Sequence, residues 1–189
     1  MTELQDYITA YFGITNQNMD IVTSLFVESE LKKGDYFAKA GQYCTSLSFV
    51  RSGYIRVFAH ANDKEVTQWI SSKGYFITDL HSFSFKQRAR WNIQALTDCE
   101  LYTINSENYT RLNKLVPHWP EIEKQFMAGC FLQLEDRVFS HLSLSAEERY
   151  DQFFENNKAI FNHVPLQYLA SMLGMSPETF SRIRSKKKS

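Results

Sequence analysis

The residues whose types and spacing could do chemistry lie near the C-terminus. Glu178 and Arg182 stand four positions apart, so on a helix their carboxylate and guanidinium project from one side, beside Thr179. Residues 164–189 contain five basic side chains against one acidic one, although the whole chain balances 21 against 21. A basic end on a neutral protein is the electrostatic footprint of a segment that meets phosphates.

Two short helices are predicted to position these side chains. Apolar residues recur between 166 and 173 at i, i+3, i+4 and i+7, which is one buried helical face. Gly174 ends this helix, since glycine readily takes the left-handed conformation. Ser176 and Pro177 then supply an N-cap and a first turn. Two helices joined by a tight glycine turn predict a helix-turn-helix, whose second helix can enter the major groove.

The string LASMLGMSPETFSRIR at residues 169–184 resembles the DNA-binding end of the Crp/Fnr family of bacterial transcription regulators, especially its short members. In that family a Gly-x-Ser-x-Glu-Thr-x-Ser-Arg run spans the turn and the recognition helix. The resemblance implies that Glu178 and Arg182 read base edges and that Ser176 and Thr179 touch the backbone. The chemistry agrees, because a glutamate carboxylate accepts a hydrogen bond from the amino group of cytosine and an arginine guanidinium donates two hydrogen bonds to guanine. The predicted DNA-binding residues are Gln167, Ser176, Glu178, Thr179, Arg182, Lys186, Lys187 and Lys188.

The sequence departs from the family pattern at two places. Pro177 stands where the best-known members have a further base-reading arginine. The chain also stops soon after the recognition helix, which leaves no room for the β-wing that often follows it. We therefore expect DNA binding, but at a different operator. The run from Lys186 to Lys188, taken alone, also fits a solvated, frayed terminus.

The composition predicts a globular protein of the cytoplasm. The chain has 189 residues, 43% hydrophobic and 15% aromatic, enough for a sizeable core in one or two domains. It contains no run of about 18 apolar residues and no secretory pattern, so we expect neither export nor membrane insertion. Cys44, Cys99 and Cys130 lack metal-ligand spacing, which predicts no metal site. No histidine lies in a metal or catalytic motif and no nucleophile elbow occurs, so an enzyme is the least supported class.

Residues 31–104 predict the sheet part of an α+β fold. Glycines separate short segments rich in Tyr, Phe, Val, Ile and Thr, which is typical of a small antiparallel sandwich or barrel. Two short helices are expected before it, between residues 2 and 29. The layout resembles the antiparallel, jelly-roll-like β-roll of the cyclic-nucleotide-binding type, which the Crp/Fnr family uses as a sensor. The expected strands cover residues 43–50, 54–59, 65–70, 92–96 and 100–104, with hairpin turns at 51–53 and 61–64.

The resemblance also locates a pocket. In the family, a cassette that begins Gly-Glu, continues to a leucine and includes an arginine followed by small residues holds the nucleotide phosphate. Here Ile77-Thr78 stands where Gly-Glu is expected, Ala89 is nearest the cassette arginine, and Trp91 replaces a small residue. We therefore expect no cyclic AMP binding and no cofactor; a different acidic ligand and an empty, aromatic-filled roll both stay open. The candidate pocket residues are Thr78, Asp79, Leu80, Arg88, Arg90 and Trp91.

A long helix is predicted at residues 119–142, with an apolar stripe wider than one packing face needs. Such a helix can cover its own β domain on one side and a second copy on the other, and the Crp/Fnr family uses a long helix here as its dimer seam. The alternative is an ordinary buried helix of a monomer. A capping box at Ser145 and Glu148 then opens the next helix. The predicted dimer-interface residues are Ile122, Phe126, Cys130, Leu134 and Val138.

These expectations describe a dimeric transcriptional regulator that binds double-stranded DNA, with RNA polymerase as a further implied partner. Residues 1–117 form its sensor domain, residues 118–142 its dimerisation helix, and residues 143–189 its helix-turn-helix domain. An effector in the roll, of unknown identity, shifts the long helices and so alters the spacing of the two recognition helices. The competing class is a protein-interaction or small-ligand-binding module without sequence-specific DNA binding.

Overall fold

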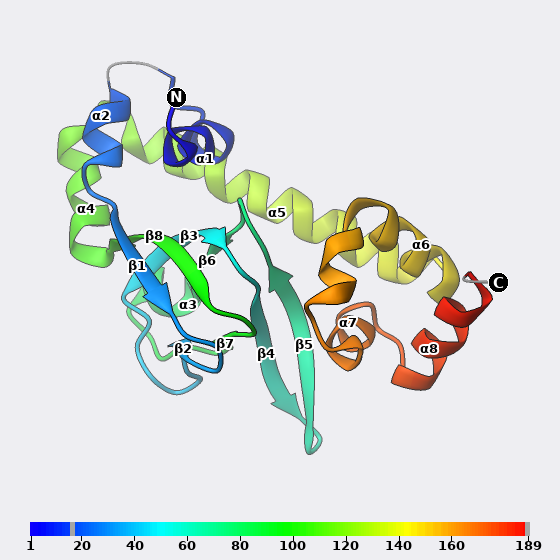
Figure 1. Cartoon of the computed structure of the whole chain (residues 1–189). Helices are drawn as coiled ribbons and strands as arrows, with labels where there is room; N and C mark the ends of the chain where they lie inside the picture. The colour runs from blue at the N-terminus through cyan, green and yellow to red at the C-terminus, as the bar shows by residue number, and fades with distance from the viewer. Residues whose placement is uncertain (16–17, 188–189) are drawn as a thin grey trace.

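The computed structural model describes residues 1–15 and 18–187 of the 189-residue chain. Figure 1 shows a β-roll with helices at one end, a long helix α5 running away from it, and a helical C-terminal part. The α+β fold class, with an antiparallel roll, a long helix and C-terminal helices, is thereby confirmed. The helices are α1 (Glu3–Phe12), α2 (Asn18–Thr23), α3 (Leu80–Phe85), α4 (Ser106–Leu115), α5 (Trp119–Ser143), α6 (Ala146–Asn156), a 3-10 helix (Lys158–Asn162), α7 (Leu166–Met172) and α8 (Pro177–Lys186).

The roll consists of two four-stranded antiparallel sheets in the described part of the chain. One sheet has the order β1-β8-β3-β6 and the other the order β2-β7-β4-β5. Apart from the β4–β5 pair, consecutive strands therefore alternate between the sheets, which places residues distant in sequence side by side. Their bounds are β1 (Val27–Leu31), β2 (Tyr36–Ala38), β3 (Ser46–Ser52), β4 (Ile55–Ala61), β5 (Lys64–Ser71), β6 (Phe76–Ile77), β7 (Asn92–Ala95) and β8 (Cys99–Asn105).

One of the two predicted hairpin turns is confirmed and the other is wrong. Residues 61–64 join β4 to β5, and the central residues Asn62 and Asp63 both have positive φ, 48° and 61°, which matches the twist of a two-residue hairpin loop. Residues 51–53 carry the chain from β3 in one sheet to β4 in the other. Gly53 there has φ 92°, a conformation that favours glycine. This turn changes sheets because its flanking strands pair with other partners.

Three buried clusters hold the described residues together. One, around Ile93, fills the space between the two sheets. A second joins the N-terminal helices to β3 and the start of α5 through Phe49 and Trp119. The third fills the C-terminal part around Leu169 and also includes Ile70 of β5. Because β5 belongs to the roll, the roll and the C-terminal helices share one packed core.

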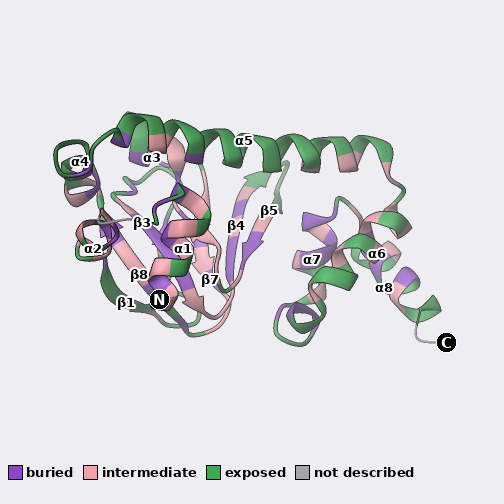
Figure 2. Cartoon of the chain, turned by 90° about the horizontal axis from the view of Figure 1, so that it is seen from above, coloured by how far each residue is buried: buried purple, intermediate pink, exposed green. Residues whose placement is uncertain are grey.

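Helix α5 lies along both parts of the molecule. Figure 2 shows its outward face exposed over most of its length, while the buried residues lie mainly in the sheets and on the inward faces of the helices below it. The predicted capping box follows it, because the Ser145 N–H donates to Glu148 Oε2 at 2.8 Å and the Glu148 N–H donates to Ser145 Oγ at 3.3 Å. This box starts α6 directly after α5, so the chain enters its C-terminal part with no long linker.

Candidate nucleic-acid interface and ligand pocket

A tight turn at Gly174 joins α7 to α8. Gly174 has φ 68°, and the Met175 N–H donates to the Ala170 carbonyl oxygen at 3.0 Å, which closes α7. Ser176 caps α8, because its Oγ accepts the Thr179 N–H at 3.2 Å. The predicted helix ends are confirmed, and each is fixed by interactions within a few residues.

The outward face of α8 carries the two side chains predicted to read bases. Glu178 and Arg182 are exposed, whereas Phe180 and Ile183, on the opposite side, are 1% and 5% exposed and belong to the C-terminal core. A hydrogen bond with the Ser176 side chain lowers the pKa of Glu178, so this group is an ionised carboxylate at neutral pH. An exposed carboxylate that only accepts hydrogen bonds therefore lies one helical turn from an exposed guanidinium that only donates them.

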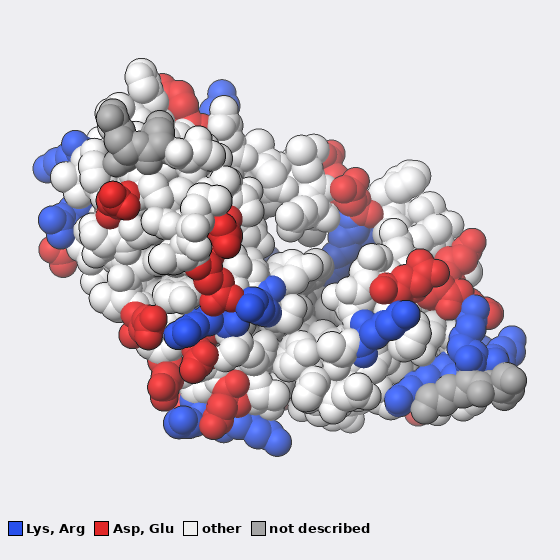
Figure 3. All heavy atoms as spheres, turned by 45° about the horizontal axis from the view of Figure 1, so that its top comes forward, with Lys and Arg blue, Asp and Glu red and all other residues white. Residues whose placement is uncertain are grey.

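The other residues predicted to contact DNA differ in their surroundings. Gln167 on α7 and Lys186 on α8 are exposed. Lys187 is also exposed, but its Nζ lies 2.8 Å from Asp151 Oδ2 of α6. Lys188 lies outside the described residues. Figure 3 shows the lysines and arginines of this end of the molecule beside a group of acidic side chains, so the positive field is weaker than the basic sequence suggests.

A pocket of about 510 Å³, the roll pocket, lies between the roll and α5. Aromatic side chains of the roll line much of it, and Arg137 from α5 adds a cation that the sequence analysis did not single out. Four of the six candidate pocket residues line it, namely Thr78, Leu80, Arg90 and Trp91.

The other two candidate pocket residues, Asp79 and Arg88, are not among its lining residues. Asp79 is 1% exposed, and its carboxylate accepts the N–H groups of Ser82, Arg90 and Trp91 at 2.8, 2.8 and 3.0 Å. It caps α3 and holds the segment that follows, which is why it is turned away from the pocket. Arg88 is exposed, and its Nη1 donates to the Gly41 carbonyl oxygen at 2.7 Å.

The apolar stripe of α5 divides into two faces, and the predicted dimer residues fall on both. Phe126 is 3% exposed and packs on Phe12, so its assignment to a dimer interface is wrong. Ile122 and Cys130 are half-buried against the same core of their own chain. Leu134 and Val138 are exposed. They belong to what we call the outer stripe, which consists of Met127, Phe131, Leu134, Val138 and Leu142.

A buried arginine that sequence reasoning missed ties the β4–β5 hairpin to α7. Arg56 is 2% exposed, and its guanidinium lies 4.1 Å from the Phe58 ring and 3.7 Å from the Tyr168 ring of α7. Its Nη1 donates to Glu65 Oε2 at 2.6 Å and its Nε to Thr67 Oγ1 at 2.9 Å. The hairpin lies beside α7 in Figure 1, so this arginine sits in the contact between the roll and the C-terminal helices.

Two further kinds of feature are absent from the described ranges 1–15 and 18–187. No group of three or more His, Cys, Asp or Glu side chains there could hold a metal ion. No helix there is long and apolar enough to span a membrane.

Comparison with known proteins finds a family that the roll matches. Residues 28–114 match the cyclic nucleotide-binding domain family. No curated protein matches the sequence. The family match covers β1 to β8 and most of α4, which is the part of the chain that contains the roll pocket.

Solved structures share the fold over most of the chain. CLP, a c-di-GMP responsive global regulator from Xanthomonas campestris, has a TM-score of 0.67 at 19% identity, over 90% of each chain. A protein assigned to the Crp/Fnr family from Eubacterium rectale has a TM-score of 0.69 at 18% identity, over 97% of this chain and 88% of that one. FixK2 from Bradyrhizobium japonicum has 0.68 at 16%, over 85% and 83%. The chain therefore has the fold of these Crp/Fnr regulators, as its sequence predicted, and its residues 28–114 match the cyclic nucleotide-binding domain family.

Proposed function

We propose that the protein is a homodimeric, DNA-binding transcriptional regulator with an effector-responsive β-roll. The observation that carries this proposal is helix α8, which buries Phe180 and Ile183 and turns Glu178 and Arg182 outward. In this arrangement residues 1–117 are the sensor, residues 118–142 join two copies, and residues 143–189 bind DNA. Helices α7 and α8 act as a helix-turn-helix with α8 in the major groove.

The exposed face of α8 has the chemistry that base recognition requires. The Glu178 carboxylate can accept a hydrogen bond from the amino group of cytosine, and the Arg182 guanidinium can donate two hydrogen bonds to guanine. Gln167 and Lys186 flank this pair and, being exposed, suit phosphate contacts that position the helix. Lys187 contributes less, because Asp151 already neutralises part of its charge.

The outer stripe supports a dimer of two identical chains. Phe131, Leu134, Val138 and Leu142 are 60%, 49%, 51% and 81% exposed. Single exposed apolar residues are ordinary, but a row of them on one helix marks an interaction surface. They are spaced three or four residues apart, which is the spacing of residues in helices that pack along their length. A second copy fits this row, because a twofold axis sets the same stripe against itself.

The surroundings of Asp79 support the expectation that the roll does not bind cyclic AMP. Three backbone N–H groups at the start of α3 and in the segment after it are suited to an anion, and the buried Asp79 carboxylate accepts all three. A bound phosphate would have to displace this carboxylate or lie near its negative charge. The effector of the roll is therefore something other than cyclic AMP. Isothermal titration is the check, and micromolar binding of cyclic AMP would overturn this part of the proposal.

The DNA proposal is tested by selecting fragments from random double-stranded DNA with the full-length protein in moderate salt. We expect enrichment of two half-sites with centres about 10 base pairs apart, or a multiple of that distance. Arg182→Ala should lose about 1–3 kcal/mol at one base pair. The matched control, Lys186→Ala, should weaken all sequences alike and reduce the salt dependence. Equal losses on selected and random DNA for Arg182→Ala would contradict base reading.

One observation favours a second function, a protein-interaction or small-ligand-binding module without sequence-specific DNA binding. Acidic side chains lie beside the basic end of the molecule, and Lys187 pairs with one of them. Such a surface attracts phosphates less than a uniformly basic one. The selection experiment separates the two functions, because an interaction module enriches no sequence.

A further inference from the structure

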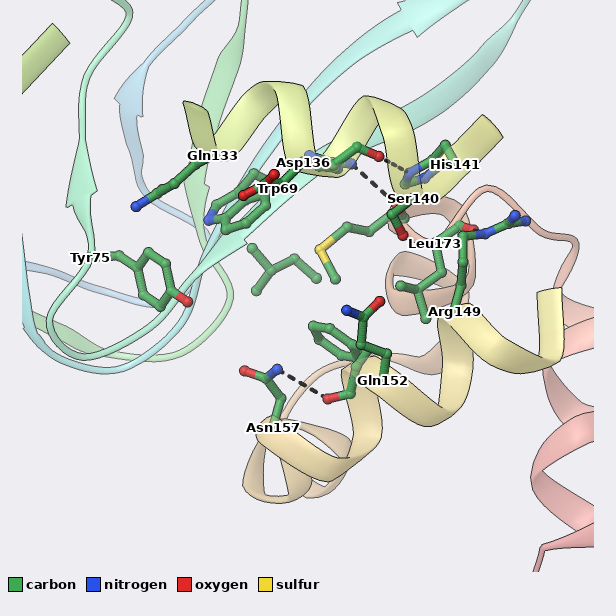
Figure 4. A pocket seen from close by; sticks show the side chains of 14 residues that line it. Trp69, Tyr75, Gln133, Asp136, Ser140, His141, Arg149, Gln152, Asn157 and Leu173 are labelled. Carbon is green, nitrogen blue, oxygen red and sulfur yellow. Dashed lines mark hydrogen bonds between the residues drawn. The ribbon is translucent and has the colours of Figure 1, made fainter. Parts of the chain in front are cut away.

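A second pocket lies where the roll, α5 and the C-terminal helices meet, and we call it the junction pocket. It has a volume of about 380 Å³. Figure 4 shows Trp69 and Tyr75 on its roll side, Asp136 and Ser140 above on α5, and Gln152 below on α6. The rest of its apolar wall consists of Ile70, Phe153, Met172 and Leu173. The junction pocket therefore combines an apolar wall with polar and charged groups that converge on it, and both are features of a ligand site.

Arg137 is the charged group that its own chain leaves least satisfied in this pocket. It is half-buried, and burial lowers its pKa. A guanidinium has several N–H donors, of which one donates to the Met172 carbonyl oxygen at 3.2 Å. The guanidinium also lies 5.1 Å from the Trp69 ring centre. In the described part of the chain no carboxylate forms an ion pair with Arg137. A half-buried cation without a counter-charge favours an anion from outside.

The other basic groups of the junction pocket are already engaged. Arg149 donates from Nε to the Leu173 carbonyl oxygen at 2.9 Å and from Nη1 to the Leu144 carbonyl oxygen at 2.6 Å. His141 Nδ1 lies 2.9 Å from the Arg137 carbonyl oxygen. Asp136 adds a carboxylate to the lining. A ligand therefore meets two guanidiniums, of which Arg137 has more open donors, beside the Asp136 carboxylate. The net charge of this group suits a single negative charge better than a doubly charged phosphate.

We propose that the junction pocket binds a small monocarboxylic acid with an aromatic or branched apolar body. The carboxylate takes the open donors of Arg137, which match it in a forked geometry. The apolar body lies between Trp69, Phe153 and Leu173. This site lies beside the roll pocket, with which it shares Trp69, Tyr75 and Gln133, and it goes beyond the proposed function. Arg137 also lines the roll pocket, so it joins the two cavities.

A ligand in the junction pocket acts on the contact between the two parts of the chain. It touches β5 through Trp69, α5 through Arg137, and the C-terminal helices through Phe153 and Leu173. In the structure the C-terminal helices pack against the roll, and we call this the docked arrangement. A ligand that binds only when the helices are docked raises the population of the docked arrangement. Occupancy should therefore change the freedom of α7 and α8 relative to the roll.

The test uses the full-length protein without DNA, so that its outcome is independent of the DNA-binding proposal. The probes are phenylacetate and phenylacetamide, which have similar size but differ in charge, and binding is measured by ligand-observed NMR. We expect phenylacetate to bind at least about 10-fold more tightly than the amide. Equal binding of the two probes, or binding of neither, overturns the proposal.

Variants then locate the site. Arg137→Gln should weaken phenylacetate about 10- to 100-fold without changing the weak binding of the amide, and Arg137→Lys should lose less because it keeps the charge. Ser140→Phe fills the junction pocket and should abolish binding, whereas Thr78→Phe fills the roll pocket and should not. The opposite result for the last pair would overturn the proposal. Each variant is first checked for an unchanged circular dichroism spectrum, and Arg137→Lys keeps the test valid if Arg137→Gln misfolds.

Discussion

The contact between Arg56 and Glu65 predicts that the two partners differ in their cost of removal. The Arg56 side chain is 2% exposed, whereas that of Glu65 is 43% exposed. Glu65→Gln therefore leaves a buried guanidinium without its carboxylate, while Arg56→Met leaves a carboxylate that water already reaches. The loss of the acid should be the more damaging change, although the acid is the more exposed partner.

The structure sets the size of the two effects. Breaking a buried ion pair by removing one partner costs about 3–5 kcal/mol, and we expect about 3 kcal/mol for Glu65→Gln because Glu65 is partly solvated. Arg56→Met loses the hydrogen bond to Thr67, worth about 1 kcal/mol. Its thioether can still pack between the Phe58 and Tyr168 rings, so little further loss follows. The double variant should resemble Arg56→Met, which gives a coupling of about 3 kcal/mol.

The measurement is urea-induced unfolding of the full-length protein, followed by circular dichroism at one fixed protein concentration. The single and double variants form a complete cycle, and each is compared with the wild type at the same pH. The reasoning is refuted if Glu65→Gln costs no more than Arg56→Met. That result would mean that the two rings and Thr67 stabilise the guanidinium without help from the carboxylate.

Three other perturbations have defined outcomes. Leu134→Asp places a charge on the outer stripe twice per dimer, so light scattering should show a monomer; a wild type that is already monomeric at micromolar concentration contradicts the dimer. A hydrogen bond from Lys73 lowers the pKa of Glu3 below its ordinary 4.5, so its stabilisation is present above that pH and lost as the pH falls; Glu3→Gln should flatten the fall in unfolding free energy in acid. Gly53→Ala puts a Cβ 2.5 Å from a backbone oxygen and should unfold the roll, whereas Gly34→Ala, also at φ 92° but with open space, should cost much less in a thermal melt.

Features set by interactions within a few residues could be predicted from the sequence. The turn at Gly174, the cap at Ser176 and the hairpin at residues 61–64 each depend on local chemistry, and the structure has all three. Strand β1 was missed because its sequence, Val-Glu-Ser-Glu-Leu, is mostly polar, and it forms by pairing with β8 far along the chain. The turn at residues 51–53 was misread for the same reason, since only strand pairing decides that the chain changes sheets.

For the sites, too, the spacing of residues could be interpreted from the sequence, whereas their three-dimensional neighbours could not. Helical spacing predicted that α5 has more apolar surface than one face needs, but it does not say which side meets the roll. Phe126 proved to be inside and Phe131 outside. The roles of Arg56 and Arg137 could not be predicted either. Arg56 and Arg137 belong to no sequence motif. Their importance comes from neighbours contributed by other elements, such as Tyr168 and Trp69.

Helix α5 joins the proposed activities, because several of its residues each belong to two surfaces. Leu134 lines the roll pocket and also lies on the outer stripe, and Arg137 lines both the roll pocket and the junction pocket. A ligand in the roll pocket therefore contacts the proposed dimer surface and the anchor of the second site through one rigid helix. Contact alone does not make a switch, since an effector shifts an equilibrium only by the difference in its affinity for the two arrangements. Leu134 and Arg137 are the positions at which such a difference can arise, because both would change their neighbours if α5 moved against the roll.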